Sequence, residues 1–385
     1  MLTDLTDIRN ILSRRRLPAL DGLRAVAVLT VMVYHFGFAS VPGDLGVTAF
    51  FVISGFLITW LLLREYERTD TVSLRSFYMR RVLRIFPAYY AFIAVTFAID
   101  FWRKDIWTPG LTGSALGYVM NYYNALHGHP STSVAHAWSL AVEEQFYLLW
   151  PLTFLVLARR GRKTIAGALV VLILLVCGWR SYLYIARGVG SAYVYNAFDT
   201  RFDELAIGCL LAVVAGSAWF SSGVRMVTCR AWLPLVTLAL LLTSRTGGSA
   251  RYHYGPGFTI DALLVATFIV QMLVLHRQWL WAWLEHPVVR FVGTISYPLY
   301  LYQLWGLDVG HRARFLPIGG ELLVGLAASG ILASGSYYVI ERPFLSMKRR
   351  FERFVTPVAA PVVPAGSYRA AAGMFDEERI TARER

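Results

Sequence analysis

Long apolar stretches separated by short polar segments dominate the pattern of hydrophobic and polar positions along this chain. A helix needs about 20 mostly apolar residues to cross the hydrocarbon core of a bilayer, with a range of about 17–25. Ten stretches reach or approach this length, and together they predict an all-α fold, a polytopic transmembrane bundle of about ten helices. The expected spans are Leu20–Phe38, Val47–Leu63, Ile85–Phe101, Leu140–Leu157, Ile165–Ile185, Phe202–Ala218, Trp232–Ser244, Phe258–Leu275, Val288–Leu307 and Leu322–Ile340.

One further apolar segment, Leu111–Leu126, contains the polar run Asn121–Asn124. If it crossed the membrane, the basic run at 159–163 would lie on the side opposite the other basic segments. We therefore expect a re-entrant or interfacial segment here, since irregular segments at membrane depth are tolerated only where protein or a cavity surrounds them.

The composition supports a membrane protein. Of 385 residues, 56% are hydrophobic and 16% are charged, whereas a soluble domain usually carries about 25% charged residues. The net charge is +13, but the basic residues cluster in short segments between apolar runs. This arrangement indicates anchoring at the bilayer surface and argues against nucleic acid as a partner.

The distribution of Lys and Arg predicts an orientation. With the N-terminus in the cytoplasm, 27 of the 37 basic residues fall on the inner side and 9 on the outer side. We expect a multi-pass protein of the plasma or inner membrane with both termini cytoplasmic and no cleaved signal peptide. The expected organisation is a cytoplasmic segment at 1–16, a transmembrane domain at 17–346, and a disordered cytoplasmic tail at 347–385.

The first expected span carries three ionisable residues, Asp21, Arg24 and His35. Arg24 and His35 are eleven residues apart, which places them on one helix face about 16 Å apart along the axis. Ionisable residues inside a membrane are costly and usually functional, and His is the natural general base at neutral pH. The alternatives are an interhelical hydrogen bond for His35 and snorkelling to the interface for Arg24.

The fourth expected span begins at Trp138 and carries Ser139, Glu143 and Tyr147 at a spacing of four residues, so these three share a face. A carboxylate there could orient a histidine and stabilise its protonated form. The alternative for Glu143 is an ion pair with a buried arginine. Glu144 points about 100° away and is the weaker candidate.

Three other groups of polar residues suggest chemistry. Ser54 is a candidate nucleophile, although a small residue for close helix packing is the stronger interpretation. Asp199 and Asp203 could bind acceptor hydroxyls, or could pair with Arg201 or cap a helix. A third group is basic and suits a phosphate-rich ligand or lipid headgroups: Arg80, Arg81 and Arg84.

No bound metal is expected. The three cysteines show neither a disulfide framework nor metal-ligand spacing. The histidines at 127, 129 and 136 have no cysteine or carboxylate in the same pattern.

These motifs together resemble the acyltransferase 3 family of membrane-bound O-acyltransferases, which modify lipopolysaccharide, peptidoglycan and other cell-surface polysaccharides. The resemblance runs from residue 17 to residue 344 and rests on seven stretches in order: LPALDGLRAVAVLTVMVYHF, VTAFFVISGFLITWLLLRE, RSFYMRRVLRIFPAYY, AWSLAVEEQFYLLWP, TRFDELAIGCLLA, ISYPLYLYQ and VIERPF.

The resemblance implies ten transmembrane helices, acyl-CoA as a co-substrate arriving from the cytoplasm, no bound cofactor, and a glycan acceptor often on the far side. Many members carry an additional extracytoplasmic SGNH domain; from the length of 385 residues we expect this chain to rely on its membrane core alone. The family motifs fall on Arg24 and His35, on Phe50, Phe51, Ser54 and Gly55, on Trp138, Ser139, Leu140 and Glu143, and on Arg80, Arg81 and Arg84.

We therefore expect acyl transfer, most simply of acetyl, from acyl-CoA to a sugar hydroxyl. His35 would remove the acceptor proton or carry the acyl group, Glu143 would orient His35, and Arg24 with the arginines of the third span would hold the CoA phosphates. Supporting or acceptor-binding roles are expected for Asp21, Ser54, Trp138, Ser139, Tyr147, Arg201 and Asp203. The main alternative is a transporter or flippase without covalent chemistry; a sensor or scaffold leaves the polar stripe unexplained.

Overall fold

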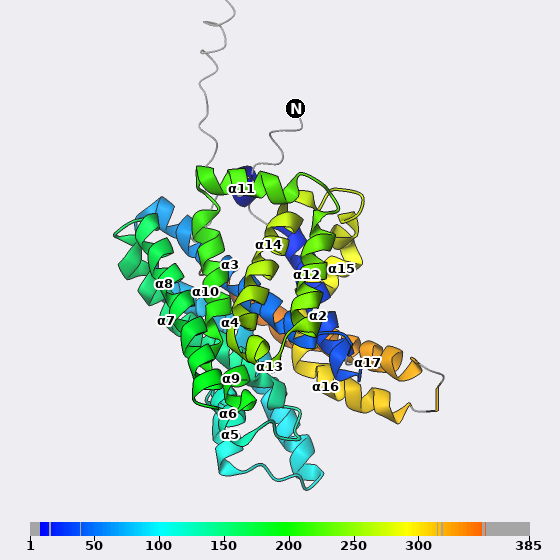
Figure 1. The fold of residues 1–385 in the computed structure, drawn as a ribbon. Coiled ribbons are helices and arrows are strands. Elements are labelled where there is room, and N and C mark those ends of the chain that lie inside the picture. Colours follow the sequence, from blue (N-terminus) through cyan, green and yellow to red (C-terminus); the bar gives the residue numbers. More distant parts are fainter. Residues whose placement is uncertain are drawn as a thin grey trace, which may run out of the picture.

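The computed structural model describes residues 8–14, 17–38, 40–313, 315–316, 319–348 and 351. All regular elements in this part of the chain are helices, which confirms the expected all-α class (Figure 1). The α-helices are α1 Ile8–Leu12, α2 Pro18–His35, α3 Gly43–Thr69, α4 Leu74–Trp102, α5 Pro109–Leu116, α6 Met120–His127, α7 Trp138–Ala158, α8 Arg162–Ser181, α9 Ser191–Asn196, α10 Phe202–Val214, α11 Ala218–Thr228, α12 Leu233–Gly247, α13 Ala250–Tyr252, α14 Phe258–Leu275, α15 Pro287–Thr294, α16 Ser296–Arg312, α17 Gly320–Ser336 and α18 Arg342–Lys348.

Short 3-10 and π segments join or extend these helices. They are η1 Ala135–Ala137, η2 Tyr182–Ala186, η3 Phe198–Thr200, η4 His253–Gly257, η5 Ala282–Glu285 and η6 Tyr337–Glu341. The expected tail beyond residue 351 and the first seven residues lie outside the described residues.

In the described part of the chain, six helices are long and apolar enough to cross a membrane, so the chain is a multi-pass membrane protein, but the expected count of about ten is not confirmed. A seventh crossing is possible if α10 and α11 form one span, although they meet at an angle of 110°. The shortfall has local causes. Helix α12 has only 15 residues, the span expected at 288–307 breaks between α15 and α16, and α2 carries three ionisable side chains.

The segment expected to be re-entrant or interfacial forms two helices, α5 and α6, of eight residues each. At a rise of about 1.5 Å per residue, each is about 12 Å long, too short to cross a bilayer core. The break between them includes Tyr118, whose φ of 55° lies in the left-handed region. Figure 1 places this pair at the end of the bundle opposite α11.

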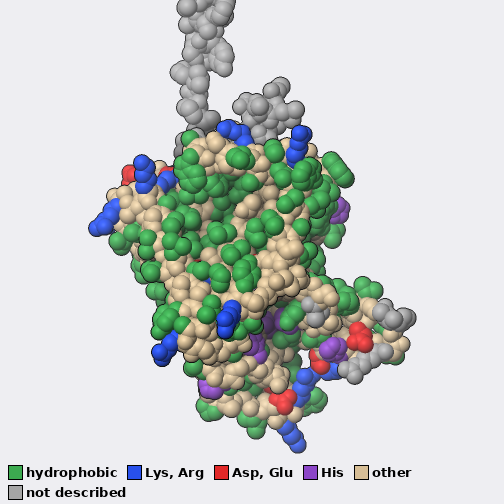
Figure 2. Space-filling view, in the orientation of Figure 1, with side chains coloured by type: hydrophobic (Ala, Val, Ile, Leu, Met, Phe, Trp, Pro, Cys, Tyr) green, Lys and Arg blue, Asp and Glu red, His purple; other side chains and the backbone are tan. Residues whose placement is uncertain are grey.

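Helix α3 is central because it packs closely on α10 and α2. A Cβ atom on Gly55 would lie 2.0 Å from the carbonyl oxygen of Leu205, and one on Gly208 would lie 2.1 Å from that of Val52. Only glycine therefore allows the two backbones to approach this closely. The contact fixes the position of Ser54, which precedes Gly55 on α3. In Figure 2 hydrophobic side chains cover much of the molecular face, and charged ones concentrate toward its two ends.

Candidate active site

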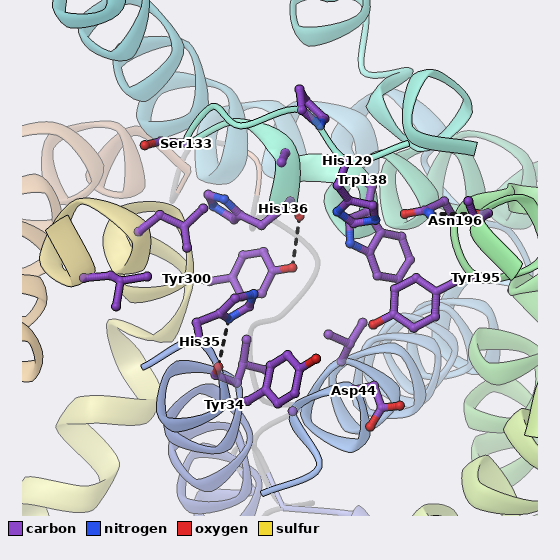
Figure 3. Close-up of a pocket in the computed structure, with 18 of the residues that line it drawn as sticks. Tyr34, His35, Asp44, His129, Ser133, His136, Trp138, Tyr195, Asn196 and Tyr300 are labelled. Atoms are coloured by element: carbon purple, nitrogen blue, oxygen red, sulfur yellow. Dashed lines mark hydrogen bonds between the residues drawn. The ribbon is translucent and has the colours of Figure 1, made fainter. Parts of the chain in front are cut away.

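A large cavity of about 1050 Å³ opens at the end of α2 and is bounded by the ends of α3, α9, α12 and α16 and by the loop before α7 (Figure 3). Its volume is at the upper end of the range for small-molecule sites, about 300–1,000 Å³. Polar and aromatic side chains dominate the wall, among them Tyr34, His35, Asp44, His129, His136, Trp138, Tyr195, Asn196, Arg245 and Tyr300.

His35 is the last residue of α2, and its half-buried ring lies in the wall of this cavity. Its Nδ1 atom lies 2.9 Å from the carbonyl oxygen of Val31, one turn earlier. A carbonyl oxygen only accepts hydrogen bonds, so Nδ1 carries the proton. In the neutral ring Nε2 therefore keeps its lone pair, as a general base requires.

A second, much smaller cavity of about 50 Å³ lies deeper in the bundle and brings together four of the expected site residues: Arg24, Ser54, Ser139 and Glu143. The carboxylate of Glu143 accepts one hydrogen bond from Ser54 Oγ and one from Tyr147 Oη, each 3.1 Å long. The expected pairing of Glu143 with His35 is therefore wrong. Both carboxylate oxygens have other partners, and the two residues line different cavities.

Tyr300 stands between the two cavities, since it and Val47 line both of them. Its hydroxyl donates to the carbonyl oxygen of His136 at 3.0 Å and lies 2.6 Å from Ser139 Oγ, which can donate to it. Two of the expected supporting residues therefore lie at these cavities. Ser139 lines the small cavity beside Tyr300, and Trp138 lies in the wall of the large cavity.

The expected arginine cluster divides into two parts. The guanidinium carbon of Arg81 lies 4.3 Å from the ring centre of Tyr147. The charges of Arg24 and Arg84 lie close enough to interact with the charge of Arg81. Within the described residues, none of these three makes an ion pair with a carboxylate. Arg80 differs, because it pairs with Glu65 at 3.3 Å. The charge of Asp21, in the first turn of α2, interacts with Arg24.

Asp203 and Arg201 lie in the core, so the expectation that Asp203 meets the acceptor is wrong. Asp203 is fully buried and accepts hydrogen bonds from Arg180 at 2.8 Å and from Thr259 at 2.6 Å. Arg201 is also fully buried and donates to Glu204 at 2.5 Å. Asp203 thus holds α8, α10 and α14 together, and neither of the expected alternatives, pairing with Arg201 or helix capping, describes it.

Arg201 also packs against the aromatic wall. Its guanidinium lies 4.0 Å from the ring centre of Phe258, 4.9 Å from that of Tyr195 and 5.4 Å from that of Trp138. Cations positioned on aromatic faces are stabilised by the ring quadrupole. The residue thus supports, from behind, two of the side chains that line the large cavity.

The formal charges around the large cavity are paired. Arg245 forms ion pairs with Asp44 and, at 3.2 Å, with Asp261, and Arg103 pairs with Asp308 at 3.0 Å. The cavity wall also lowers the pKa of His129, because desolvation disfavours the charged imidazole. The cavity therefore presents mostly neutral groups at neutral pH.

Sequence reasoning missed several of these residues. Arg180 and Arg245 gave a usable signal, since each is a charge in or beside an apolar stretch. Tyr300 and Asn196 gave none, because their importance depends on which distant helices meet. Among the described residues, no group of three or more His, Cys, Asp or Glu side chains could hold a metal ion.

Comparison with known proteins gave two kinds of match. A family model described as an acyltransferase domain matches residues 17–337. A protein of Listeria monocytogenes named peptidoglycan O-acetyltransferase OatA is 32% identical over 356 residues, covering 86% of this chain and 56% of that protein. A Staphylococcus aureus protein named O-acetyltransferase OatA is 32% identical over 375 residues, covering 91% of this chain and 60% of that protein.

The chain thus spans less than two thirds of the length of these curated relatives. No solved structure matches it.

Proposed function

Because this chain belongs to the family whose acyltransferase model spans residues 17–337, we propose that it transfers an acyl group, most simply acetyl, from acyl-CoA to a hydroxyl of a cell-envelope glycan. The observation that carries the proposal is the position of His35 in the wall of a large polar cavity, with Nδ1 bonded to Val31 and Nε2 left to accept a proton. Two relatives named O-acetyltransferases favour this reaction over transport without covalent chemistry.

The proposed reaction begins when Nε2 of His35 takes the proton of an acceptor hydroxyl. The acceptor oxygen then attacks the thioester carbonyl of the donor, the C–S bond breaks, and the CoA thiolate leaves. The imidazolium returns its proton to that thiolate, so the products are an O-acyl glycan and free CoA. Nε2 is also the atom that would carry the acyl group in a two-step route.

Donor binding is proposed for the three arginines around Tyr147. Arg24, Arg81 and Arg84 are available for phosphate because no carboxylate within the described part of the chain forms an ion pair with them. Arginine suits this task, since its planar fork binds phosphate oxygens in pairs. Arg80 contributes less to donor binding in this proposal, because its guanidinium already forms an ion pair with Glu65.

Glu143 acts in this proposal as a positioning residue for the passage between the two cavities. By accepting from Ser54 and Tyr147 it fixes both side chains, and its charge offsets that of Arg24. Val47 and Tyr300 separate the small cavity from the large one, so the acyl group would pass them to reach His35. The excess of basic residues expected on the inner side supports a cytoplasmic donor side and cytoplasmic termini.

The test uses the purified full chain in lipid nanodiscs with acetyl-CoA labelled in the acetyl group and a soluble peptidoglycan fragment as acceptor. Labelled O-acetyl product and an equal amount of free CoA are expected from the wild type, and His35→Ala should form neither above background. Product formation by His35→Ala at the wild-type rate would overturn the role of His35. A transporter would release no CoA. Labelled protein that accumulates without acceptor would identify the two-step route.

A further inference from the structure

Two polar side chains in the wall of the large cavity are buried but carry polar atoms that make no hydrogen bond of ordinary geometry. His136 is 4% exposed, and neither Nδ1 nor Nε2 of its ring makes a hydrogen bond of ordinary geometry in the described residues. Asn196 is fully buried; its Nδ2 donates to the carbonyl oxygen of Ala192 at 2.7 Å, and Oδ1, with the His129 side chain nearby, makes no hydrogen bond of ordinary geometry. Buried polar groups in native proteins are nearly always hydrogen-bonded, so two such groups in one cavity indicate a polar ligand.

An aromatic pair adjoins these groups. The rings of Trp138 and Tyr195 lie 4.9 Å apart at an angle of 50° and face the cavity (Figure 3). The buried guanidinium of Arg201 supports both rings from the protein side. In Figure 3, Tyr195 and Asn196 lie across the cavity from His35, and His136 lies near Tyr300 on the other flank. A ligand between these walls would reach His35.

The chemistry of the wall favours a neutral sugar. The C–H face of a pyranose ring is apolar and packs against aromatic rings, while its hydroxyls both donate and accept hydrogen bonds. A neutral imidazole supplies one donor and one acceptor, and the free Asn196 oxygen supplies an acceptor. Since Arg245 and Arg103 are already paired with carboxylates, the cavity offers little to a phosphate-rich ligand.

We propose that Trp138, Tyr195, Asn196 and His136 form a sugar subsite that holds a neutral pyranose ring of the acceptor and presents its hydroxyl to His35. The proposal rests on the proposed function and deepens it by naming the residues that recognise the acceptor. Trp138 and Tyr195 provide the stacking surface. Asn196 and His136 gain in the complex the hydrogen bonds that they lack without it.

The experiment measures binding of chitotetraose, a neutral β-1,4-linked tetramer of N-acetylglucosamine, to the full chain in nanodiscs by isothermal titration calorimetry. His136→Phe and Asn196→Leu keep the approximate side-chain volume but remove the unpartnered polar atoms. Each should weaken binding at least tenfold. Because removal of an unsatisfied buried group costs no hydrogen bond, Tm should stay unchanged or rise for His136→Phe. A merely structural role for His136 would lower Tm instead.

Three further variants make the result decisive. His127→Phe, on an exposed histidine outside the large cavity, should bind like the wild type. Ser131→Trp, on an exposed residue of the cavity wall, should block binding without disturbing the core. His35→Ala should still bind the tetramer while losing acyl transfer.

Wild-type affinity in His136→Phe and Asn196→Leu, or no binding by the wild type itself, would overturn the subsite. Acyl transfer by the wild type in the preceding assay would leave the proposed function standing in that case. Conversely, subsite-dependent binding without any release of CoA from acetyl-CoA would reject the proposed function and retain the subsite.

Discussion

The two cavities of this bundle differ in whether the arginines near them form ion pairs with carboxylates. Around the small cavity, Arg24, Arg81 and Arg84 gather near Tyr147 without an ion pair of their own in the described residues. Around the large cavity, each arginine in the wall has a carboxylate partner. Arginines without ion pairs beside the small cavity suit an anionic donor, and paired charges around the large cavity suit a neutral acceptor. The proposed function assigns the first environment to the donor and the second to the acceptor, with Tyr300 in the wall of both cavities.

Breaking the charge pairing of the large cavity should have the largest effect. Arg245→Gln leaves Asp261, which is 1% exposed, and Asp44 without their cation. Loss of one partner of a buried ion pair costs about 3–5 kcal/mol, so we expect a large fall in Tm measured by nanodisc thermal unfolding. The double variant Arg245→Gln/Asp261→Asn should recover part of the loss, and a Tm equal to that of the wild type in Arg245→Gln would contradict the pairing.

Removing a charge from the small-cavity region should act on the donor alone. Arg84→Gln removes a potential charge-assisted hydrogen bond to phosphate, worth about 1.5–3 kcal/mol, so KM for acetyl-CoA should rise about 12–160-fold. The KM for the acceptor should stay unchanged. Arg80→Gln serves as the matched control, because Arg80 is already paired with Glu65 and should shift the donor KM less. Equal shifts in both variants would contradict the division of the cluster.

The boundary between the two regions should show a smaller effect. Tyr300→Phe removes the hydroxyl that contacts Ser139 and the carbonyl oxygen of His136. A neutral hydrogen bond contributes about 0.5–1.5 kcal/mol, so kcat should fall about 2–12-fold with both KM values little changed. Steady-state kinetics with each substrate varied in turn would check this. A selective rise in one KM would instead assign Tyr300 to a single cavity.

The smallest effect is expected at the mouth of the large cavity. Arg103 and Asp308 pair at 3.0 Å, but their side chains are 41% and 48% exposed. Exposed ion pairs contribute about 0.2–1 kcal/mol, so Arg103→Gln should change Tm and acceptor KM only slightly, and less at high salt. A large loss of acceptor binding in this variant would mean that Arg103 contacts the acceptor directly.

The sequence predicted the local part of the site because helix periodicity is local. Arg24 and His35 do lie on one helix, and Ser139 and Glu143 do line the same small cavity with Ser54. The hydropathy pattern located helices at all ten expected spans, but it could not show the break between α15 and α16 or the bend after α10.

The pairing of distant residues could not be read from the sequence. Glu143 bonds Ser54, 89 positions away, and Asp203 bonds Arg180 and Thr259 on two other helices. Such partners depend on helix packing, which the periodicity of a single segment does not encode. The buried His136 and Asn196 lie on short connecting helices whose sequence gives no sign that they face a cavity.

The central claim is that the donor binds on the arginine side, the acceptor binds in the large cavity, and the acyl group passes between them at Tyr300. The most direct measurement reconstitutes the protein in sealed vesicles of one determined orientation, with chitotetraose inside and labelled acetyl-CoA outside. When the face bearing Arg81 and Arg84 points outward, labelled O-acetyl tetramer should accumulate in the lumen, and none should form in vesicles of His35→Ala. Product that forms only when donor and acceptor share one compartment would contradict the claim.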